Sequence, residues 1–373
     1  MNNKHAIYIV SPTEKRNNQS TEYLVKENYS ILKVKTGNIQ KTNRIEKGIS
    51  TLLIEAQFKS AIKKYFANIK FDLIVYATPP ITFSKVVKAI KKRDHAKSYL
   101  LLKDIFPQNA VDLQMFSEKG IIKRYFRQKE KQLYQISDYI GCMSQANVDY
   151  ILKHNTFINA DSVEICPNSI EVVDIQVKGK RQIREKYNIP QDKKIFVYGG
   201  NLGKPQGIDH LCACLEKCRK IEDAFFIVVG SGTEFKKLET FIKHQKLPNV
   251  RLLSQLPKTD YESLVVTCDV GLIFLDKRFT IPNFPSRLLS YMQAAMPMIA
   301  CTDVNTDIGK TIEAGHFGYW CESKEPQDFK ECVEKMCTST DLKEMGQKAR
   351  NYLEEHYTVE QSYQIIMKHF KEQ

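Results

Sequence analysis

Short apolar runs rich in β-branched and aromatic residues alternate with helical patterns along the whole chain. The runs cover residues 6–10, 71–76, 98–102, 139–143 and 163–166, and then 195–198, 225–229, 250–252, 270–274 and 298–301. Strands that alternate with helices in this way form parallel sheets whose faces the helices cover. A chain of 373 residues also exceeds the size at which one hydrophobic core keeps growing. The sequence therefore predicts an α/β protein with two doubly wound domains.

The boundary between the two domains is expected near residue 170. Residues 168–194 are charged and weakly patterned, which predicts a linker there. We therefore expect a first domain at 1–170 and a second at 171–350. The chain end is helical in pattern, and residues 351–373 are expected to pack back on the first domain.

A glycine-rich loop, Tyr198-Gly-Gly-Asn-Leu-Gly-Lys-Pro-Gln-Gly207, lies between a predicted strand and a helical pattern that starts near Ile208. Glycines let a ligand approach the backbone, and the loop amides and helix start favour negative charge. Lys204 adds a mobile cation, so the loop predicts a diphosphate-bearing ligand. The spacing fits neither the P-loop nor the dinucleotide fingerprint. An ordinary glycine-rich turn between strand and helix remains the alternative.

Two further loops at predicted strand ends contain residues suited to ligand binding. In the first, Gly230 and Gly232 leave room for a base or a ribose. In the second, Ser286 stands near a helix start as a possible cap, and Arg287 occupies the first turn. A cation there opposes the helix dipole unless an anion lies nearby, so Arg287 indicates a phosphate. A merely solvated arginine is the alternative.

The net charge of +13 is concentrated in the first half of the chain. Residues 1–170 hold 27 Lys and Arg against 15 Asp and Glu, while the remainder holds 29 against 28. A basic half indicates an anionic partner, either nucleic acid, a phosphate-bearing substrate or an acidic membrane surface. Nucleic acid is least favoured, because the basic half lacks interleaved aromatics in a known module. The alternative explanation of the positive charge, which involves no partner, is a generally basic proteome.

The ten cysteines show no disulfide framework, which is typical of a reducing compartment. Cys212, Cys214 and Cys218 allow a metal site, but their helical spacing favours core packing. The chain has no helix-length uncharged apolar run, and its start leads straight into a predicted strand rather than a signal-peptide core. We therefore expect a cytoplasmic protein.

With these pieces in order, the chain resembles GT-B glycosyltransferases, specifically the family 4-like enzymes of bacterial capsule, O-antigen and exopolysaccharide assembly. The resemblance covers nearly the whole length. It rests on the segments 199–204, 206–207, 229–232, 285–292 and 295–297 in the second half, and on 101–107 and 166–170 in the first.

The resemblance implies two Rossmann-like domains that face each other across a cleft. It assigns nucleotide-sugar binding to the second domain, through Gly200, Asn201, Gly203, Lys204, Gly230, Gly232, Ser286, Arg287 and Ser290. It assigns the acceptor to the first domain, with Lys103 and Gln108 as contacts and Asp104 as the group that orients or deprotonates the acceptor hydroxyl. No metal or cofactor is expected, because cationic side chains and amides stabilise the leaving diphosphate.

The sequence departs from the family in two places. Family 4 enzymes carry two glutamates eight positions apart, and these positions are Pro282 and Ser290 here. The first strand is followed by residues 11–16, which lack the usual glycine-rich acceptor loop.

The reaction implied is retaining transfer of a sugar from a UDP-sugar to a polyprenyl-diphosphate-linked sugar at the inner face of the cell membrane. Two amphipathic segments are candidates for a peripheral contact with that anionic surface. The first carries the stripe Phe58, Ile62, Tyr65 and Phe66, and the second is 121–127. Packing of these stripes in the core is the alternative. A nucleotide-sugar epimerase and a non-catalytic partner of an active transferase are the competing functions.

Overall fold

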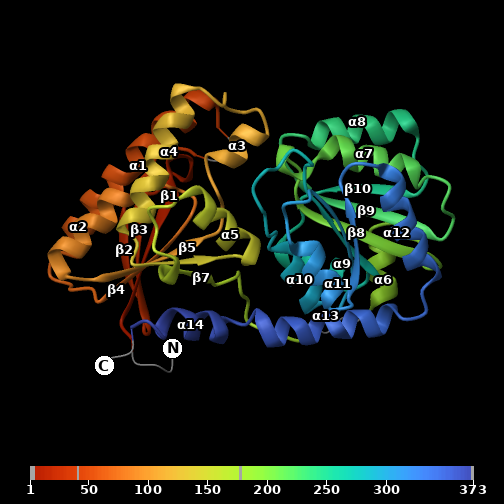
Figure 1. Cartoon of the computed structure of the whole chain (residues 1–373). Coiled ribbons are helices and arrows are strands. Elements are labelled where there is room, and N and C mark those ends of the chain that lie inside the picture. Colours follow the sequence, from red (N-terminus) through yellow and green to blue (C-terminus); the bar gives the residue numbers. More distant parts are fainter. Residues whose placement is uncertain (1–4, 40–41, 176–178, 371–373) are drawn as a thin grey trace. The chain divides into compact units, whose positions relative to one another are not determined.

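The computed structural model describes residues 5–39, 42–175 and 179–370. These residues form two compact units, which Figure 1 colours by position in the sequence. One unit holds the described residues up to Pro107 together with Phe116–Gly141 and His154–Glu164. The other holds Gln108–Met115, Cys142–Lys153 and the described residues from Ile165 onward. The predicted domain ranges 1–170, 171–350 and 351–373 remain predictions.

The second unit is built on a six-stranded sheet with the order β10-β9-β8-β11-β12-β13. Its strands are β8 (Lys194–Asn201), β9 (Ala224–Ser231), β10 (Val250–Ser254), β11 (Val270–Phe274), β12 (Met298–Thr302) and β13 (Gly318–Glu322). All neighbouring pairs run parallel. The chain starts in the middle of the sheet, winds outward to β10 and then returns to build the other half from β11. This is the doubly wound topology that the sequence predicts.

Helices cover both faces of this sheet. They are α6 (Lys180–Lys186), α7 (Ile208–Lys217), α8 (Phe235–Gln245), α9 (Lys258–Val265), α10 (Arg287–Gln293), α11 (Ile308–Ala314), α12 (Pro326–Thr338) and α13 (Leu342–His356), with the short 3-10 turn η3 (Lys204–Gln206). Helix α14 (Val359–Met367) follows α13 and has no buried residue. Side chains of α7, α8 and α12 pack with one sheet face, and those of α9, α10, α11 and α13 pack with the other. Because every residue of β11 and β12 is buried, these strands carry continuous apolar runs rather than alternating ones.

The first half of the chain contributes two smaller sheets. A three-stranded sheet, β1-β3-β2, joins β1 (Ile7–Glu14), β2 (Glu22–Val25) and β3 (Tyr29–Thr36). A four-stranded sheet, β4-β5-β6-β7, joins β4 (Leu73–Ala77), β5 (Lys97–Leu102), β6 (Tyr139–Cys142) and β7 (Val163–Ile165). The helices are α1 (Arg44–Tyr65), α2 (Ser84–Asp94), α3 (Gln108–Asp112), α4 (Ile121–Ile136) and α5 (Gln145–His154), with the 3-10 turns η1 (Lys15–Asn17) and η2 (Ala160–Ser162).

The core of the first unit decides whether the apolar stripe at 58–66 contacts a membrane or packs inside the protein. Phe58, Ile62 and Phe66 are buried in a cluster with Leu32 and Val34 of β3. The apolar stripe predicted as a membrane contact therefore faces the core, because α1 packs against the sheet along that side. The start of α4 differs, since Ile121 is 83% exposed.

The expected linker at 168–194 is too long. Helix α6 lies inside it, and its Arg184 is 4% exposed. The guanidinium donates to the carbonyl of Thr267 and to the carboxylate of Asp269, with Nη2 distances of 2.6 and 2.9 Å. This segment is charged because α6 docks on the second unit through an ion pair. Within the described residues, no helix combines the length and the apolar character needed to cross a bilayer.

Candidate anion-binding site

The glycine-rich loop lies where the strand order of the six-stranded sheet reverses. Strand β8 pairs with β9 on one side and with β11 on the other, and β8 ends at Asn201 inside the loop. In open α/β sheets, ligands bind beyond the carboxyl ends of the strands at this point. Helix α7 starts at Ile208, directly after the loop.

Two glycines of the loop have backbone angles that favour glycine. Gly200 has φ +126° and is exposed, and Gly207 has φ +57°. A Cβ on Gly207 would lie 3.2 Å from the Cα of Asp276, whose N–H donates to the carbonyl of Pro205 at 3.0 Å. The loop therefore packs tightly against the chain that leaves β11.

Gly230 and Gly232 have packing roles of their own. A Cβ on Gly230 would lie 1.9 Å from the carbonyl oxygen of Gly200, and one on Gly232 would lie 2.2 Å from that of Leu202. Both glycines let the end of β9 approach the glycine-rich loop. Their assignment to nucleoside binding stays a prediction.

Arg287 is the first residue of α10 and points at the loop. Its Cζ lies 4.2 Å from the ring centroid of Tyr198, within the range of a cation–π contact. A Cβ on Gly200 would lie 3.4 Å from its Nη2. The structure therefore brings together two residues that the sequence assigned to one site.

The guanidinium of Arg287 lacks an anionic partner. Its Nη1 is shielded from solvent and has no hydrogen-bond partner, and no carboxylate of the described residues forms an ion pair with it. Burial works against the charge, but the hydroxyls of Tyr198, Tyr291 and Tyr261 outweigh burial and raise the pKa of Arg287. Arg287 is thus a shielded cation with an unused donor, which is the arrangement an anion completes.

Three tyrosines, Tyr198, Tyr261 and Tyr291, lie next to Arg287 and the glycine-rich loop. Burial raises the pKa of Tyr261 to about 12, and burial also raises the pKa of Tyr198 and Tyr291. All three are therefore neutral at physiological pH. The Tyr198 hydroxyl donates to the carbonyl of Asn201 at 2.8 Å and closes the turn.

Tyr291 joins the two strands that diverge at the switch point. Its hydroxyl accepts the N–H of Gly199 at 3.2 Å and lies 3.1 and 3.2 Å from the carbonyls of Val197 and Leu272. Because β8 and β11 separate here, the hydroxyl takes up backbone groups that no longer pair with each other. The sequence analysis did not assign these tyrosines, although Tyr198 opens the glycine-rich motif.

Asn201, Gly203 and Lys204 are the other loop residues that were predicted to bind the ligand. Lys204 is exposed at the first position of η3. The side chain of Gln206 accepts from the Nδ2 of Asn201 at 3.1 Å and from the N–H of Gly203 at 3.2 Å, so it braces the loop from inside. Ligand contacts by Asn201, Gly203 and Lys204 stay predictions.

The helix start at α10 differs from the expectation in one detail. Ser286 holds the N-cap position, but its backbone is already helical and its side chain makes no capping hydrogen bond. Ser286 and Ser290 are both exposed, whereas Pro282 is buried. The two hydroxyls are therefore available at the surface near Arg287, and no carboxylate stands at either position where the resemblance places glutamates.

The predicted acceptor residues follow β5. Thr78, which is 2% exposed, accepts the N–H groups of Lys103 and Asp104 at 3.0 and 3.1 Å and donates to the carbonyl of Asp104 at 3.1 Å. Gln108 donates to the carboxylate of Asp112 at 2.9 Å. Thr78 thus fixes the backbone that presents Asp104. The sequence analysis did not single it out, because a lone threonine before two prolines has no distinctive pattern.

Within the described residues, Cys212, Cys214 and Cys218 do not converge on one metal site of their own. Cys212, Cys214 and Cys218 are buried in the core cluster on one face of the six-stranded sheet. In the described part of the chain, the ligand atoms that converge are those of His210, Cys214 and Cys301. This group lies outside the anion-binding site.

Part of the chain matches a known protein family. Residues 179–352 match the family described as "Glycosyl transferases group 1". The chain is 22% identical over 289 residues to the probable glycosyltransferase WbjE of Pseudomonas aeruginosa, covering 77% of this chain and 71% of WbjE. It is 20% identical over 252 residues to the putative colanic acid biosynthesis glycosyl transferase WcaI of Escherichia coli K12, covering 65% of this chain and 60% of WcaI.

The fold has solved counterparts. The crystal structure of Anabaena HepE in complex with UDP-glucose superposes with a TM-score of 0.70 at 14% identity, covering 98% of this chain and 99% of HepE. At this identity the likeness concerns the fold, which has the two parallel sheets expected of GT-B proteins. Residues 179–352 thus match the group 1 glycosyltransferases, and the chain as a whole has the GT-B fold.

Proposed function

We propose that this enzyme transfers a sugar from a UDP-sugar to a lipid-linked saccharide acceptor, with retention, during the synthesis of a surface polysaccharide. The observation that carries the proposal is Arg287, a shielded cation without a carboxylate partner at the switch point of the second unit. HepE, which shares the fold, binds UDP-glucose, and WcaI is named for colanic acid biosynthesis.

The chemistry of such a transfer explains why an unpaired cation belongs here. Negative charge grows on the leaving diphosphate while the sugar becomes oxocarbenium-like. Groups that are already oriented toward that charge lower the barrier more than groups that must rearrange. Tyr198 stacks beneath Arg287 and no ion pair has to be broken, so the guanidinium is ready for the diphosphate. Lys204 and the amides after Gly200 add further positive potential.

The acceptor side is assigned to the first unit. Asp104 is our candidate for orienting or deprotonating the acceptor hydroxyl, with Lys103 as a contact. Gln108, which the sequence analysis also predicted as a contact, belongs to the second unit. Thr78 supports this role, because its three hydrogen bonds hold the backbone of Lys103 and Asp104 in one conformation. A carboxylate that handles a proton in the transition state must be positioned in this way.

An anionic membrane surface is the proposed location of the acceptor. The first 170 residues carry a net charge of +12. Helix α1 exposes an apolar stripe formed by Ile45, Ile49, Leu52 and Leu53, whose exposed fractions are 77, 54, 55 and 51%. Their spacing of i, i+4, i+7 and i+8 puts them on one side of the helix. This α1 stripe replaces the 58–66 stripe as the apolar contact.

Binding of UDP to an Arg287 variant tests the donor assignment. Arg287→Ala should weaken UDP binding in isothermal titration by roughly tenfold to a hundredfold, since a charge-assisted contact contributes about 1.5–3 kcal/mol. Arg287→Lys should restore only part of the affinity, because a lysine lacks the planar fork and the stacking on Tyr198. Arg219→Ala is the matched control, since Arg219 pairs with Glu216 at the end of α7. Unchanged affinity of a folded Arg287→Ala protein would refute the assignment.

A further inference from the structure

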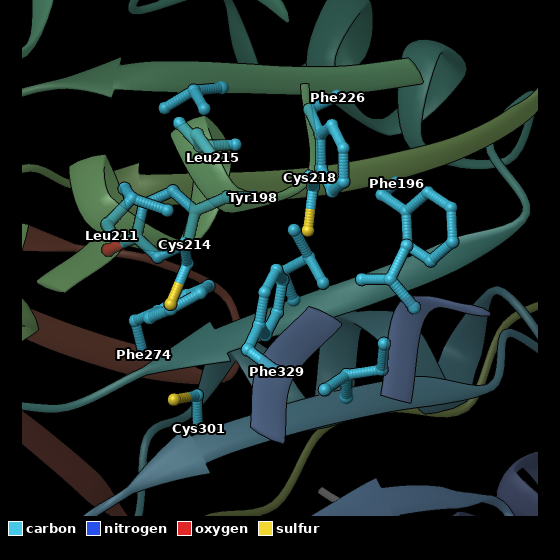
Figure 2. Packing of buried hydrophobic residues seen from close by; sticks show 14 of the residues in the cluster. Phe196, Tyr198, Leu211, Cys214, Leu215, Cys218, Phe226, Phe274, Cys301 and Phe329 are labelled. Carbon is cyan, nitrogen blue, oxygen red and sulfur yellow. The ribbon is translucent and has the colours of Figure 1, made fainter. Parts of the chain in front are cut away.

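A histidine and two cysteines converge on one face of the six-stranded sheet. His210 and Cys214 lie one turn apart on α7, and Cys301 lies on β12. The His210 Nε2 is 3.4 Å from the Cys214 Sγ and 3.3 Å from the Cys301 Sγ. All three ligand atoms lie within 4.8 Å of one another. Figure 2 shows Cys214 and Cys301 near Phe274 in the core.

The distances fit the edges of a tetrahedral metal site. Zinc binds imidazole nitrogen at about 2.0–2.1 Å and thiolate sulfur at about 2.3 Å, so neighbouring nitrogen and sulfur ligands stand about 3.5 Å apart. The two measured nitrogen–sulfur distances lie within 0.2 Å of that value. Both nitrogen–sulfur edges of such a site are therefore already present, and the three ligand atoms lie within 4.8 Å of one another.

Ordinary hydrogen bonding accounts for part of this convergence, since the Cys301 thiol can also donate to the carbonyl of Glu322 at 3.8 Å. Nε2 of a neutral imidazole offers either one lone pair or one proton, yet it lies close to two sulfur atoms. Nε2 can therefore take part in only one of the two nitrogen–sulfur hydrogen bonds at a time, and a thiol is a weak donor and acceptor. Cys212 on the same helix and Cys218 at its end are buried in the same apolar cluster as Cys214 and Cys301, but neither belongs to the group of converging ligand atoms.

We propose that His210, Cys214 and Cys301 bind a thiophilic divalent cation of the zinc type. Binding releases the two thiol protons to solvent, so two thiolates, one neutral imidazole and one divalent cation form a site with no net charge. Charge neutrality matters because Cys214 and Cys301 are both 0% exposed. His210 is half-buried, which gives the ion an approach from solvent and leaves water as the fourth ligand on that side.

The site would tie a helix of the second unit to its sheet. Helix α7 starts one residue after Gly207, the last residue of the glycine-rich loop, and β12 pairs with β11. A cation bound by both elements would hold the start of α7 in place and thereby fix the end of the loop. This role is structural and requires no part in the transfer reaction.

Cobalt binding to the full-length chain tests the proposal directly. The protein is first treated with a chelator and a thiol reductant, and Co²⁺ is then added while the visible spectrum is recorded. We expect the intense d–d bands of tetrahedral cobalt and thiolate-to-cobalt charge transfer, saturating at one ion per chain and displaced by Zn²⁺. Zn²⁺ should also raise the unfolding temperature, because a ligand that binds only the folded state stabilises it.

The variants make the test specific. Cys214→Ala and His210→Gln should each weaken Co²⁺ binding by more than about a hundredfold, since even second-shell changes at metal sites cost about ten to a hundredfold. Cys212→Ala is the matched control, because it removes a buried thiol from the same helix and should bind cobalt like the wild type. His210→Gln changes a half-buried side chain and keeps the test open if Cys214→Ala does not fold.

Two results would overturn the proposal. One is the absence of tetrahedral cobalt bands in the folded wild-type protein. The other is cobalt binding that survives His210→Gln, or that Cys212→Ala removes equally, since the ion would then be held by other thiols. The readout is independent of UDP affinity, so the metal site and the donor site can fail separately.

Discussion

Asp104 is the residue on which the proposed acceptor chemistry depends. Asp104→Asn keeps the shape of the side chain but removes the carboxylate, while Thr78 continues to hold the backbone. We expect turnover to fall by about a hundredfold to ten-thousandfold, with UDP affinity unchanged. The measurement is the rate of UDP release with a polyprenyl-diphosphate-linked sugar at saturation. The exposed Asp161 of the same unit serves as the control, as Asp161→Asn should turn over normally. Equal rates in all three proteins would remove Asp104 from the mechanism.

At the residue scale, the sequence predicted that Arg287 and the glycine-rich loop belong together, but not which side chains support them. Arg287 was found because a cation in a first helical turn opposes the helix dipole, and the glycine-rich loop was found from its spacing after a strand. Tyr261 and Tyr291 were not found, since a tyrosine inside a helix reads as a core residue. Their hydroxyls meet at the loop only because the sheet brings together strands that are distant in sequence, as the contact of Tyr291 with Gly199 shows.

Among the elements, most strands were predicted from their apolar runs, including the edge strands β1, β4, β7 and β10, whereas β2, β3 and β13 were missed. All five predicted strands of the six-stranded sheet are confirmed, and β11 has the predicted bounds. Strand β13 was missed because it carries a polar end, and β2 because it has only four residues. The central strand β3 was missed because Lys33 and Lys35 interrupt its apolar run. A strand buried on both faces is a continuous apolar run, whereas a partly exposed strand is not.

The turn after β12 holds the loop that leads to Arg287, and its stability should depend on pH. The N–H groups of Asn305 and Thr306 and the hydroxyl of Thr306 donate to Asp303, each at 2.9 Å. Asn305 in turn donates to the carbonyl of Phe279, and the N–H of Asn283 donates to the Thr306 hydroxyl. Burial outweighs the hydrogen bonds and raises the pKa of Asp303 to about 6.

The sign of this pH dependence follows from the raised pKa. Below the ordinary pKa of an aspartate, Asp303 is protonated in both states and its full contribution to stability is present. As the pH rises through about 6 the contribution is lost, because ionisation is more costly in the folded protein. Urea unfolding from about pH 4 to about pH 7 should show the stability of the wild type falling by about 2–3 kcal/mol relative to Asp303→Asn. A constant difference between the two proteins would contradict this expectation.

For the whole molecule, charge and exposed apolar surface fall together on the first half of the chain. The net charge of +12 was evident in the sequence. Of the two amphipathic segments predicted as its apolar counterpart, the stripe at Phe58, Ile62 and Phe66 packs in the core, whereas Ile121 and Ile122 of the segment 121–127 are exposed. Residues 58–66 read as amphipathic because one side packs in the core. The α1 stripe at the other end of the same helix could not be recognised from periodicity, which does not say which side of a helix is covered.

Vesicle co-sedimentation of the full chain tests whether this surface meets a membrane. The chain should bind vesicles containing phosphatidylglycerol at low ionic strength and leave them as salt is raised, because screening shortens the reach of each Lys and Arg. Ile49→Ser combined with Leu52→Ser should weaken binding by at least about tenfold, since full burial of one such side chain contributes about 1.5–3 kcal/mol. Val304→Ser, at a residue 64% exposed in the second unit, should bind like the wild type. Equal binding to neutral phosphatidylcholine vesicles would exclude a role for charge, and unchanged binding of the α1 variant would exclude the stripe.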